Sequence, residues 1–246
     1  MRISVLGASG AWPTADEPCS GFLVEQEGFR LLMDVGYATL PRLLRHVPAE
    51  QVDAVVVTHG HPDHCADLNP LLRARALGPQ PPPRLPVFAP PGTLDAVLAL
   101  DRPGMLDDAY LLRPIEPGGR FEAGPFSVET RLLPHWVPNA GLRVTAGGAT
   151  LAYTGDCGPD PGVVELARDA DLLIAEATYV DRMDADDAPY LTSALDAGRE
   201  AAQAGVGRLL LTHLWPGAEP GLALQAAARS YSGGAAVAFS GQSIEL

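Results

Sequence analysis

The chain has 246 residues, of which 30 are acidic and 17 basic, and its formal net charge is −13. Every basic residue is an arginine. Mechanisms that need a lysine, such as phosphate-loop nucleotide binding and Schiff-base chemistry, are therefore excluded. A chain this acidic is also a poor binder of long nucleic acids and anionic membranes, which both require clustered cations. The composition favours a soluble globular protein that acts on a small substrate.

Short apolar runs bounded by turn residues predict the strands of the first half. These strands span residues 2–6, 22–26, 29–34, 52–57 and 85–89. Helical patterning predicts helices over 38–46, 64–77 and 93–100. The stretch 78–92 holds seven prolines, which is typical of an interdomain linker or of a stiff loop. Because an apolar run lies inside it, we favour the stiff loop within one domain.

The second half alternates strands and helices more regularly. Strands are expected over 126–133, 141–146, 149–153, 171–175, 208–212 and 235–239, and helices over 161–168, 193–204 and 219–230. This order predicts an α/β protein in which two mixed sheets pack together with helices outside, as a single domain over 1–246. No stretch approaches the roughly 20 apolar residues of a membrane helix. Three scattered cysteines predict reduced thiols and a cytoplasmic protein.

The segment 52–64 carries the clearest chemistry, because an apolar strand runs directly into three histidines and a carboxylate: His59, His61, Asp63 and His64. Imidazole and carboxylate groups are ligands for zinc, manganese or iron. His59 and His61 can converge on one ion, while Asp63 and His64 turn toward a second point nearby. Two cations about 3.5–4 Å apart can share one water molecule and lower its pKa.

Three more candidate ligands, His135, Asp156 and His213, each follow a predicted strand later in the chain. Singly, each is more typical of a structural residue. Five of the six histidines stand at strand ends, however, and His46 on a predicted helix is the exception. The set therefore indicates a binuclear metal site rather than a group of polar turn residues.

The motif His-x-His-x-Asp-His at 59–64, with the later His, Thr-Gly-Asp and His blocks, resembles the metallo-β-lactamase superfamily. Within it, the chain is similar to the branch of ribonuclease Z and small phosphodiesterases. Val5–Gly10 matches the opening strand and glycine loop, Leu31–Gly36 the strand ending in Asp-x-Gly, and Glu176–Tyr179 a further motif. The resemblance implies a four-layer αβ/βα sandwich of two mixed sheets, and it implies a homodimer.

The resemblance also implies two divalent metal ions, with zinc expected and manganese or iron as alternatives. It assigns one ion to His59, His61 and His135, the other to Asp63, His64 and His213, and the bridging position to Asp156. Cys157 and Cys65 adjoin ligands, and we expect them to pack rather than bind metal, because the Asp156 carboxylate already fills the bridging role.

Transfer-RNA processing is disfavoured by two features. Members with that activity carry a long arm between the third-motif histidine and the bridging aspartate, whereas His135 and Asp156 are only 21 residues apart here. The net charge of −13 also lacks the basic face that tRNA requires.

The proton donor to the leaving group is expected to differ from that of the branch. Relatives pair the glutamate of Glu-Ala-Thr with a histidine in a His-x-Thr motif, whereas this chain has Glu176 and, at the corresponding place, Tyr190. With a pKa near 10, a tyrosine is a poorer proton shuttle at neutral pH. Tyr190 is therefore either a catalytic residue or a loop residue that packs.

The overall pattern looks most like small phosphodiesterases that cleave cyclic nucleotides or related phosphodiesters. A metal-bridging hydroxide would attack phosphorus, and Asp63 would orient it as well as bind metal. A lactone, ester or thioester hydrolase and a catalytically weak metal-binding protein are the alternatives. Arg143 and Arg182 are candidate phosphate contacts by position, although surface charges are the more ordinary interpretation. The acidic loop 181–187 is either a lid or a solvated loop.

Overall fold

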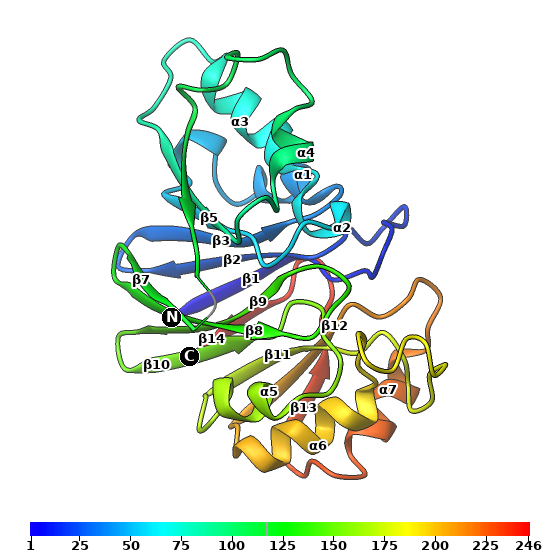
Figure 1. Ribbon diagram of the computed structural model, residues 1–246. Coiled ribbons are helices and arrows are strands. Elements are labelled where there is room, and N and C mark those ends of the chain that lie inside the picture. The colour runs from blue at the N-terminus through cyan, green and yellow to red at the C-terminus, as the bar shows by residue number, and fades with distance from the viewer. Residues whose placement is uncertain (117) are drawn as a thin grey trace.

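Two mixed β-sheets lie face to face at the centre of the molecule (Figure 1). The computed structural model describes residues 1–116 and 118–246. The first sheet has the strand order β14 (Ser243–Glu245), β1 (Arg2–Gly7), β2 (Gly21–Gln26), β3 (Phe29–Val35), β4 (Ala54–Val56), β5 (Leu85–Ala89) and β6 (Tyr110–Pro114). Strands β14 to β3 pair antiparallel, and strands β3 to β6 pair parallel.

The second sheet repeats this mixture. Its order is β13 (Gly234–Val237), β12 (Arg208–Thr212), β11 (Leu172–Glu176), β10 (Ala149–Tyr153), β9 (Asn139–Ala146), β8 (Phe126–Leu133) and β7 (Arg120–Ala123). Strands β7 to β10 are antiparallel, and β10 to β13 are parallel. Because β8 and β10 both pair antiparallel with β9, strands β8, β10 and β12 point the same way and end at one edge of the sheet.

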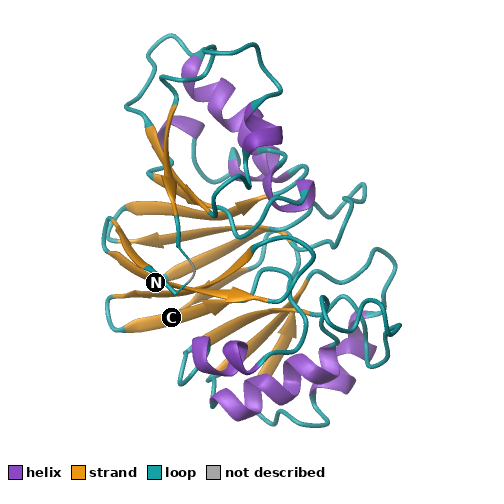
Figure 2. Ribbon diagram, in the orientation of Figure 1, coloured by secondary structure: helices purple, strands orange, loops and turns teal. Residues whose placement is uncertain are grey.

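Helices cover the outer face of each sheet, as the purple ribbons of Figure 2 show. The first sheet is covered by α1 (Thr39–Leu43), α2 (Pro62–Cys65), α3 (Leu68–Ala76) and α4 (Asp95–Leu98), with a 3₁₀ turn at Ala49–Gln51. The second is covered by α5 (Pro161–Leu166), α6 (Ala194–Ala204) and α7 (Pro220–Ala227). The expected four-layer αβ/βα sandwich is confirmed.

Alternating side chains along the strands explain why the layers form. On β3, Leu31 and Met33 enter the core between the sheets, whereas Leu32 faces the helices. On β10, Leu151 and Tyr153 enter the same central core, and Ala152 faces the helices. Since both faces of these strands are buried, the strands appear in the sequence as unbroken apolar runs.

The strands expected from the sequence are all present, with ends shifted by at most two residues. Strands β6, β7 and β14 were not predicted, because they are short edge strands with exposed residues and no apolar run. The expected helix over 64–77 is wrong: it is broken around Asp67, whose N–H donates to the Val35 carbonyl and whose carboxylate accepts from Leu40 N–H.

The proline-rich stretch 78–92 contains β5, which pairs with both β4 and β6. It therefore belongs to the first sheet and does not link two separate units. Among the described residues, no helix is both long enough and apolar enough to cross a bilayer. The assignment of the whole chain to one domain stays a prediction.

Candidate metal centre

The candidate metal ligands meet at the carboxyl ends of strands from both sheets. His59 follows β4, His61 caps the amino end of α2, and α2 itself carries Asp63 and His64. His135, Asp156 and His213 follow β8, β10 and β12, the three strands that end at one edge of the second sheet. Strand ends of open sheets are where α/β proteins place their sites, as the sequence led us to expect.

The seven residues form two clusters that share one carboxylate. The first cluster consists of His59, His61, His135 and Asp156, and the second of Asp63, His64, Asp156 and His213. Within each cluster, the possible ligand atoms lie within 4.8 Å of one another. Ligand atoms bound to one ion at about 2.0–2.2 Å lie about 3–4 Å apart, so both clusters have the size of a metal site.

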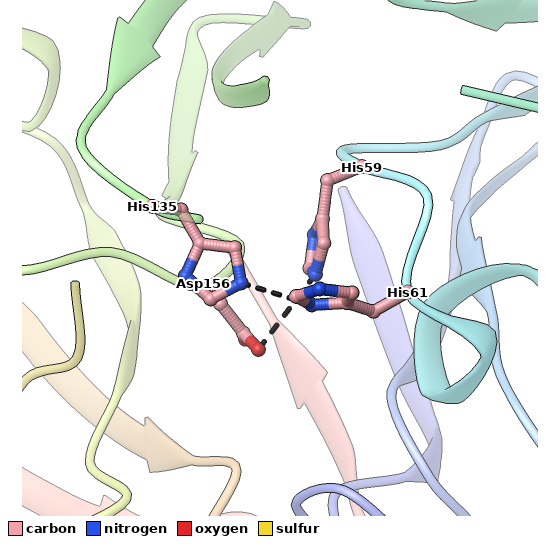
Figure 3. Close-up of side chains that lie close together, drawn as sticks. All are labelled: His59, His61, His135 and Asp156. Atoms are coloured by element: carbon pink, nitrogen blue, oxygen red, sulfur yellow. Dashed lines mark hydrogen bonds and ion pairs between the residues drawn. The ribbon is translucent and has the colours of Figure 1, made fainter. Parts of the chain in front are cut away.

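Figure 3 shows how the first cluster converges, with three imidazoles and the Asp156 carboxylate directed at one point. His135 Nε2 lies 3.0 Å from His61 Nδ1, and His59 Nε2 lies 3.8 Å from an Asp156 oxygen. In the second cluster, His213 Nε2 lies 3.1 Å from carboxylate oxygens of both Asp63 and Asp156.

Unpartnered buried atoms show that these side chains fit a metal ion. His59 Nε2, His64 Nε2 and Asp156 Oδ1 are buried without a hydrogen-bond partner in the described structure. His64 Nε2 and Asp156 Oδ1 are 3.1 Å apart, yet their relative orientation does not make a hydrogen bond. Orphaned buried polar atoms are costly, and cations bound between them would satisfy all three.

Asp34 orients two of the histidines through their Nδ1 atoms, directly for His64 and through Thr58 for His59. Its Oδ2 accepts from His64 Nδ1 at 2.7 Å and from the Thr58 hydroxyl at 2.9 Å. Because the Thr58 hydroxyl donates to Asp34, its oxygen can accept from His59 Nδ1, 3.0 Å away. Tyr153 Oη donates to the same carboxylate oxygen at 2.8 Å. Both histidines are thereby left with Nε2 free to bind metal, as second-sphere carboxylates commonly arrange.

A matching relay holds His213. The Thr178 hydroxyl lies 2.9 Å from His213 Nδ1 and donates to Glu176 at 2.6 Å. His135 is fixed differently, since its Nδ1 donates to the backbone carbonyl of Tyr190 at 2.9 Å. Sequence reasoning did not assign Asp34, Thr58 or Thr178, although Asp34 ends an apolar strand in the Asp-x-Gly motif.

Burial and neighbouring charges set the protonation of this donor set. Burial lowers the pKa of His59 well below its ordinary value, which keeps the imidazole neutral. Burial also opposes the charge of His64, but the Asp156 and Asp34 carboxylates beside it raise its pKa well above the usual range. Burial works against ionised Asp156 too, yet His213 and His64 hold its pKa well below the ordinary value. Buried carboxylates that stay ionised and stabilise a positive charge beside them are suited to binding a divalent cation.

The backbone is strained where it places these groups. Asp34 and His213 have φ values of +56° and +62°, in the left-handed region that costs a non-glycine residue about 1–3 kcal/mol. Gly155, with φ +60°, precedes Asp156, and a Cβ there would lie 2.3 Å from Asn139 Oδ1. Such strain concentrates at functional sites, where the surrounding structure maintains it.

The two clusters open into a cleft of about 480 Å³. Its lining comprises Ala11, His61, Pro62, Asp63, His135, Trp136, Asp156, Thr178, Asp187, Leu191, His213 and Trp215. Within the described part of the chain, no arginine lines it. Arg182 lies exposed, and Arg143 donates instead to the Leu166 and Arg168 carbonyls. Neither arginine lines the cleft, which agrees with the more ordinary interpretation of both as surface charges.

The expected pairing of Glu176 with Tyr190 is not found among the described residues. Glu176 is fully buried and accepts from Cys157 N–H, Thr192 N–H and the Thr178 hydroxyl. The Tyr190 ring instead lies 5.3 Å from that of Trp136. Glu176 is thus placed to orient Thr178, and a catalytic role of the Tyr190 hydroxyl stays a prediction.

The remaining expectations concern neighbours of the ligands. Cys157 packs with Leu133, Val163 and Leu166, and Cys65 belongs to the core beneath α2 and α3, so neither lies in a ligand cluster. In the acidic loop 181–187, Asp187 reaches the cleft, where its carboxylate accepts from the Tyr179 hydroxyl at 2.5 Å.

Comparisons with known proteins agree with this geometry. The β-lactamase superfamily domain matches residues 29–214. The chain belongs to the metallo-hydrolases of the β-lactamase superfamily. Similar to it is the probable metallo-hydrolase YhfI of Bacillus subtilis, with 36% identity over 218 residues and 87% of each chain covered. The crystal structure of YhfI has a TM-score of 0.91 at 32% identity and covers 99% of both chains.

Ribonuclease Z proteins of this superfamily are more distant. That of Haloferax volcanii is 28% identical over 303 residues, covering all of this chain and 95% of the relative. The short form of human tRNase Z has a TM-score of 0.82 at 24% identity, covering 100% of this chain and 99% of that one. This last similarity shows the shared fold alone.

Proposed function

We propose that this superfamily member is a phosphodiesterase that hydrolyses a small phosphodiester, such as a cyclic nucleotide, with two divalent metal ions. The observation that carries the proposal is the pair of clusters sharing Asp156 at the floor of a cleft that no described arginine lines. Relatives named ribonuclease Z support the chemistry, because RNA is itself a phosphodiester.

The ions would be held as the resemblance implies, one by His59, His61 and His135, the other by Asp63, His64 and His213, with Asp156 between them. Zinc is the proposed metal, since it accepts three imidazoles and a carboxylate. When bound, such ions neutralise charge on phosphoryl oxygens and activate water.

Asp63 is the residue proposed to orient the attacking water. Its Oδ2 accepts from Ala11 N–H at 2.9 Å and lies 3.1 Å from His213 Nε2. Every contact described for this carboxylate goes to Oδ2, so Oδ1 is left to accept a hydrogen bond from the water. In this proposal, Asp63 would contribute to catalysis by aligning the water for in-line attack on phosphorus.

The leaving group would depart toward the cleft mouth. The Tyr190 hydroxyl is the proposed proton donor, and its ring lies 5.3 Å from that of Trp136, which lines the cleft. Tyr190→Phe tests this role, because that variant keeps the ring and the backbone carbonyl that holds His135. Glu176 acts in the proposal as a positioning residue, through Thr178 on His213.

Long nucleic acids are disfavoured as substrates. The 21-residue interval between His135 and Asp156 is filled by the β9–β10 hairpin, and the net charge is −13. Asp187 adds a carboxylate to the cleft itself, which repels polyanions. With three buried unpaired cysteines, we place the protein in the cytoplasm, and we expect a homodimer.

A carboxyl-ester, lactone or thioester hydrolase is the second candidate. It is favoured by an apolar groove of about 770 Å³ beside His135, whose lining includes Leu132, Leu133 and Val137. An acyl group would fit there while its carbonyl reached the metal ions.

Activity on a substrate panel tests the proposal. Protein loaded with zinc, manganese or iron would be assayed on cyclic nucleotides, bis(p-nitrophenyl) phosphate, lactones and precursor tRNA. We expect turnover of the small phosphodiesters, abolished in His213→Ala and retained in the matched control His46→Ala, whose exposed histidine lies outside both clusters. Turnover of lactones alone would favour the second candidate, and inactivity with full metal content would indicate a metal-binding protein.

A further inference from the structure

All three tryptophans of the chain lie exposed at or beside the metal cleft. Trp12, Trp136 and Trp215 are 45%, 50% and 40% exposed, whereas the aromatic rings of Phe22 and Phe126 are fully buried in the central core. An indole has the largest apolar surface of any side chain, so leaving all three in water is unfavourable without a bound group to cover them.

Trp136 and Trp215 line the cleft, and each directly extends a turn that carries a ligand. Trp136 adjoins His135, and Trp215 is two residues beyond His213. One indole therefore comes with the first cluster and the other with the second. A substrate that binds at the metal ions therefore shares the cleft with both indoles.

Neighbouring rings fix both indoles in place. Trp12 packs edge-on against Trp215, with ring centres 5.2 Å apart at 88°, and Tyr179 lies 6.4 Å from the same indole. Tyr190 lies 5.3 Å from Trp136 at an interplanar angle of 35°. Since each indole packs against another ring, the indoles of Trp136 and Trp215 are preorganised for binding rather than free to rotate.

We infer that Trp136 and Trp215 are specificity-determining residues that stack on a planar heteroaromatic ring of the substrate, the base of a nucleotide. This inference rests on the proposed function and names its substrate class. A cleft of about 480 Å³ falls in the range of about 300–1,000 Å³ that small ligands occupy. Every base presents a π-face, and stacking on aromatic side chains is the general way in which proteins hold unpaired bases.

The alternative occupants fit less well. An aliphatic chain has its own apolar groove past Leu132 and Leu133, which gains nothing from Trp215. A protein partner would use a broad patch, whereas these indoles line a concave site with metal ligands at its floor.

The test compares a nucleoside 3′,5′-cyclic phosphate with the ribose 3′,5′-cyclic phosphate that lacks the base. In Trp136→Leu and Trp215→Leu, we expect KM for the nucleotide to rise about 5- to 150-fold, which is the stacking contribution of about 1–3 kcal/mol per base. The kcat/KM for the base-free compound should fall far less than that for the nucleotide. Phe239→Leu, a change of an exposed ring outside the cleft, is the matched control.

Ligand binding supplies a readout that needs no turnover. We expect adenosine monophosphate to quench the tryptophan fluorescence of the wild-type protein, ribose 5-phosphate to leave it unchanged, and both Leu variants to lose the response. If neither cyclic phosphate is hydrolysed but the quenching occurs, the proposed function fails and the base-binding cleft stands. If both cyclic phosphates are hydrolysed with equal KM, and adenosine monophosphate and ribose 5-phosphate quench the fluorescence equally, the inference is overturned while the phosphodiesterase stands.

Discussion

The two ligand clusters share Asp156 but differ in how firmly the protein holds them. In the first cluster, His61 and His135 are half-buried and border the cleft, and His135 is fixed by a backbone carbonyl. In the second, all four ligands are buried, and hydrogen bonds with Asp34, Thr178 and Ala11 hold three of them, His64, His213 and Asp63 in that order. The second cluster is thus a preformed site and the first an open one. We expect chelators to remove the ion of the first cluster sooner.

Asp34→Asn should weaken the second cluster most, because Asp34 contacts His64 directly and reaches His59 of the first cluster only through Thr58, and it gives the largest effect. Asparagine tolerates the left-handed φ, but its NH2 group cannot accept the hydrogen bonds that the second carboxylate oxygen accepts from its partners. His64 would change tautomer and lose its free Nε2, so affinity for the second ion should fall about 10- to 100-fold. Competition with a fluorescent chelator measures this, with the exposed Asp171→Asn as the matched control.

A variant with unchanged affinity at the second cluster would show that Asp34 is not what makes that cluster the firmer one. Unfolding of the metal-free proteins separates this effect from stability, because Asp34 also accepts from the buried Tyr153 hydroxyl.

Glu200 on α6 contacts the loop that follows the shared ligand Asp156, and its ionisation gives a smaller, pH-dependent test of how that loop is stabilised. It is buried, and its carboxylate accepts from Asp160 N–H. Burial raises its pKa from 4.5 to about 8. Folding therefore favours the protonated form: this contribution to stability is complete below pH 4.5 and is lost as the pH rises toward 8.

Glu200→Gln removes that dependence. The free energy of unfolding should rise by about 1–3 kcal/mol at pH 8.5 and change little at pH 4.5, since glutamine resembles the protonated acid. Denaturant unfolding at the two pH values checks this, with the exposed Glu50→Gln as control. Equal effects of Glu200→Gln at both pH values would contradict the buried, protonated state.

The ligands of both clusters differ in how directly the sequence predicts them. Four ligands lie within six residues after one apolar strand, and a motif that dense indicates metal by itself. His135, Asp156 and His213 were predicted because buried strands appear as apolar runs, which show where each strand ends. That they meet is a consequence of strands β8, β10 and β12 running the same way.

What supports the ligands was less predictable. Asp34 and Thr178 act through contacts between segments far apart in the chain, and a single polar residue at a strand end does not reveal its partner. The Glu176–Tyr190 pairing, taken from the resemblance, failed because Thr178 and two backbone N–H groups already satisfy Glu176. The grouping of the tryptophans around the cleft likewise arises from the fold rather than from any local pattern.

Metal content tests the central claim most directly, because Asp156 belongs to both clusters. After reconstitution and removal of free metal, elemental analysis of the wild-type protein should give about two ions per chain. Asp156→Ala should bind fewer than about one, while Asp171→Ala, a surface aspartate in the same half, stays near two. A folded Asp156→Ala that still binds about two ions would contradict the shared binuclear centre.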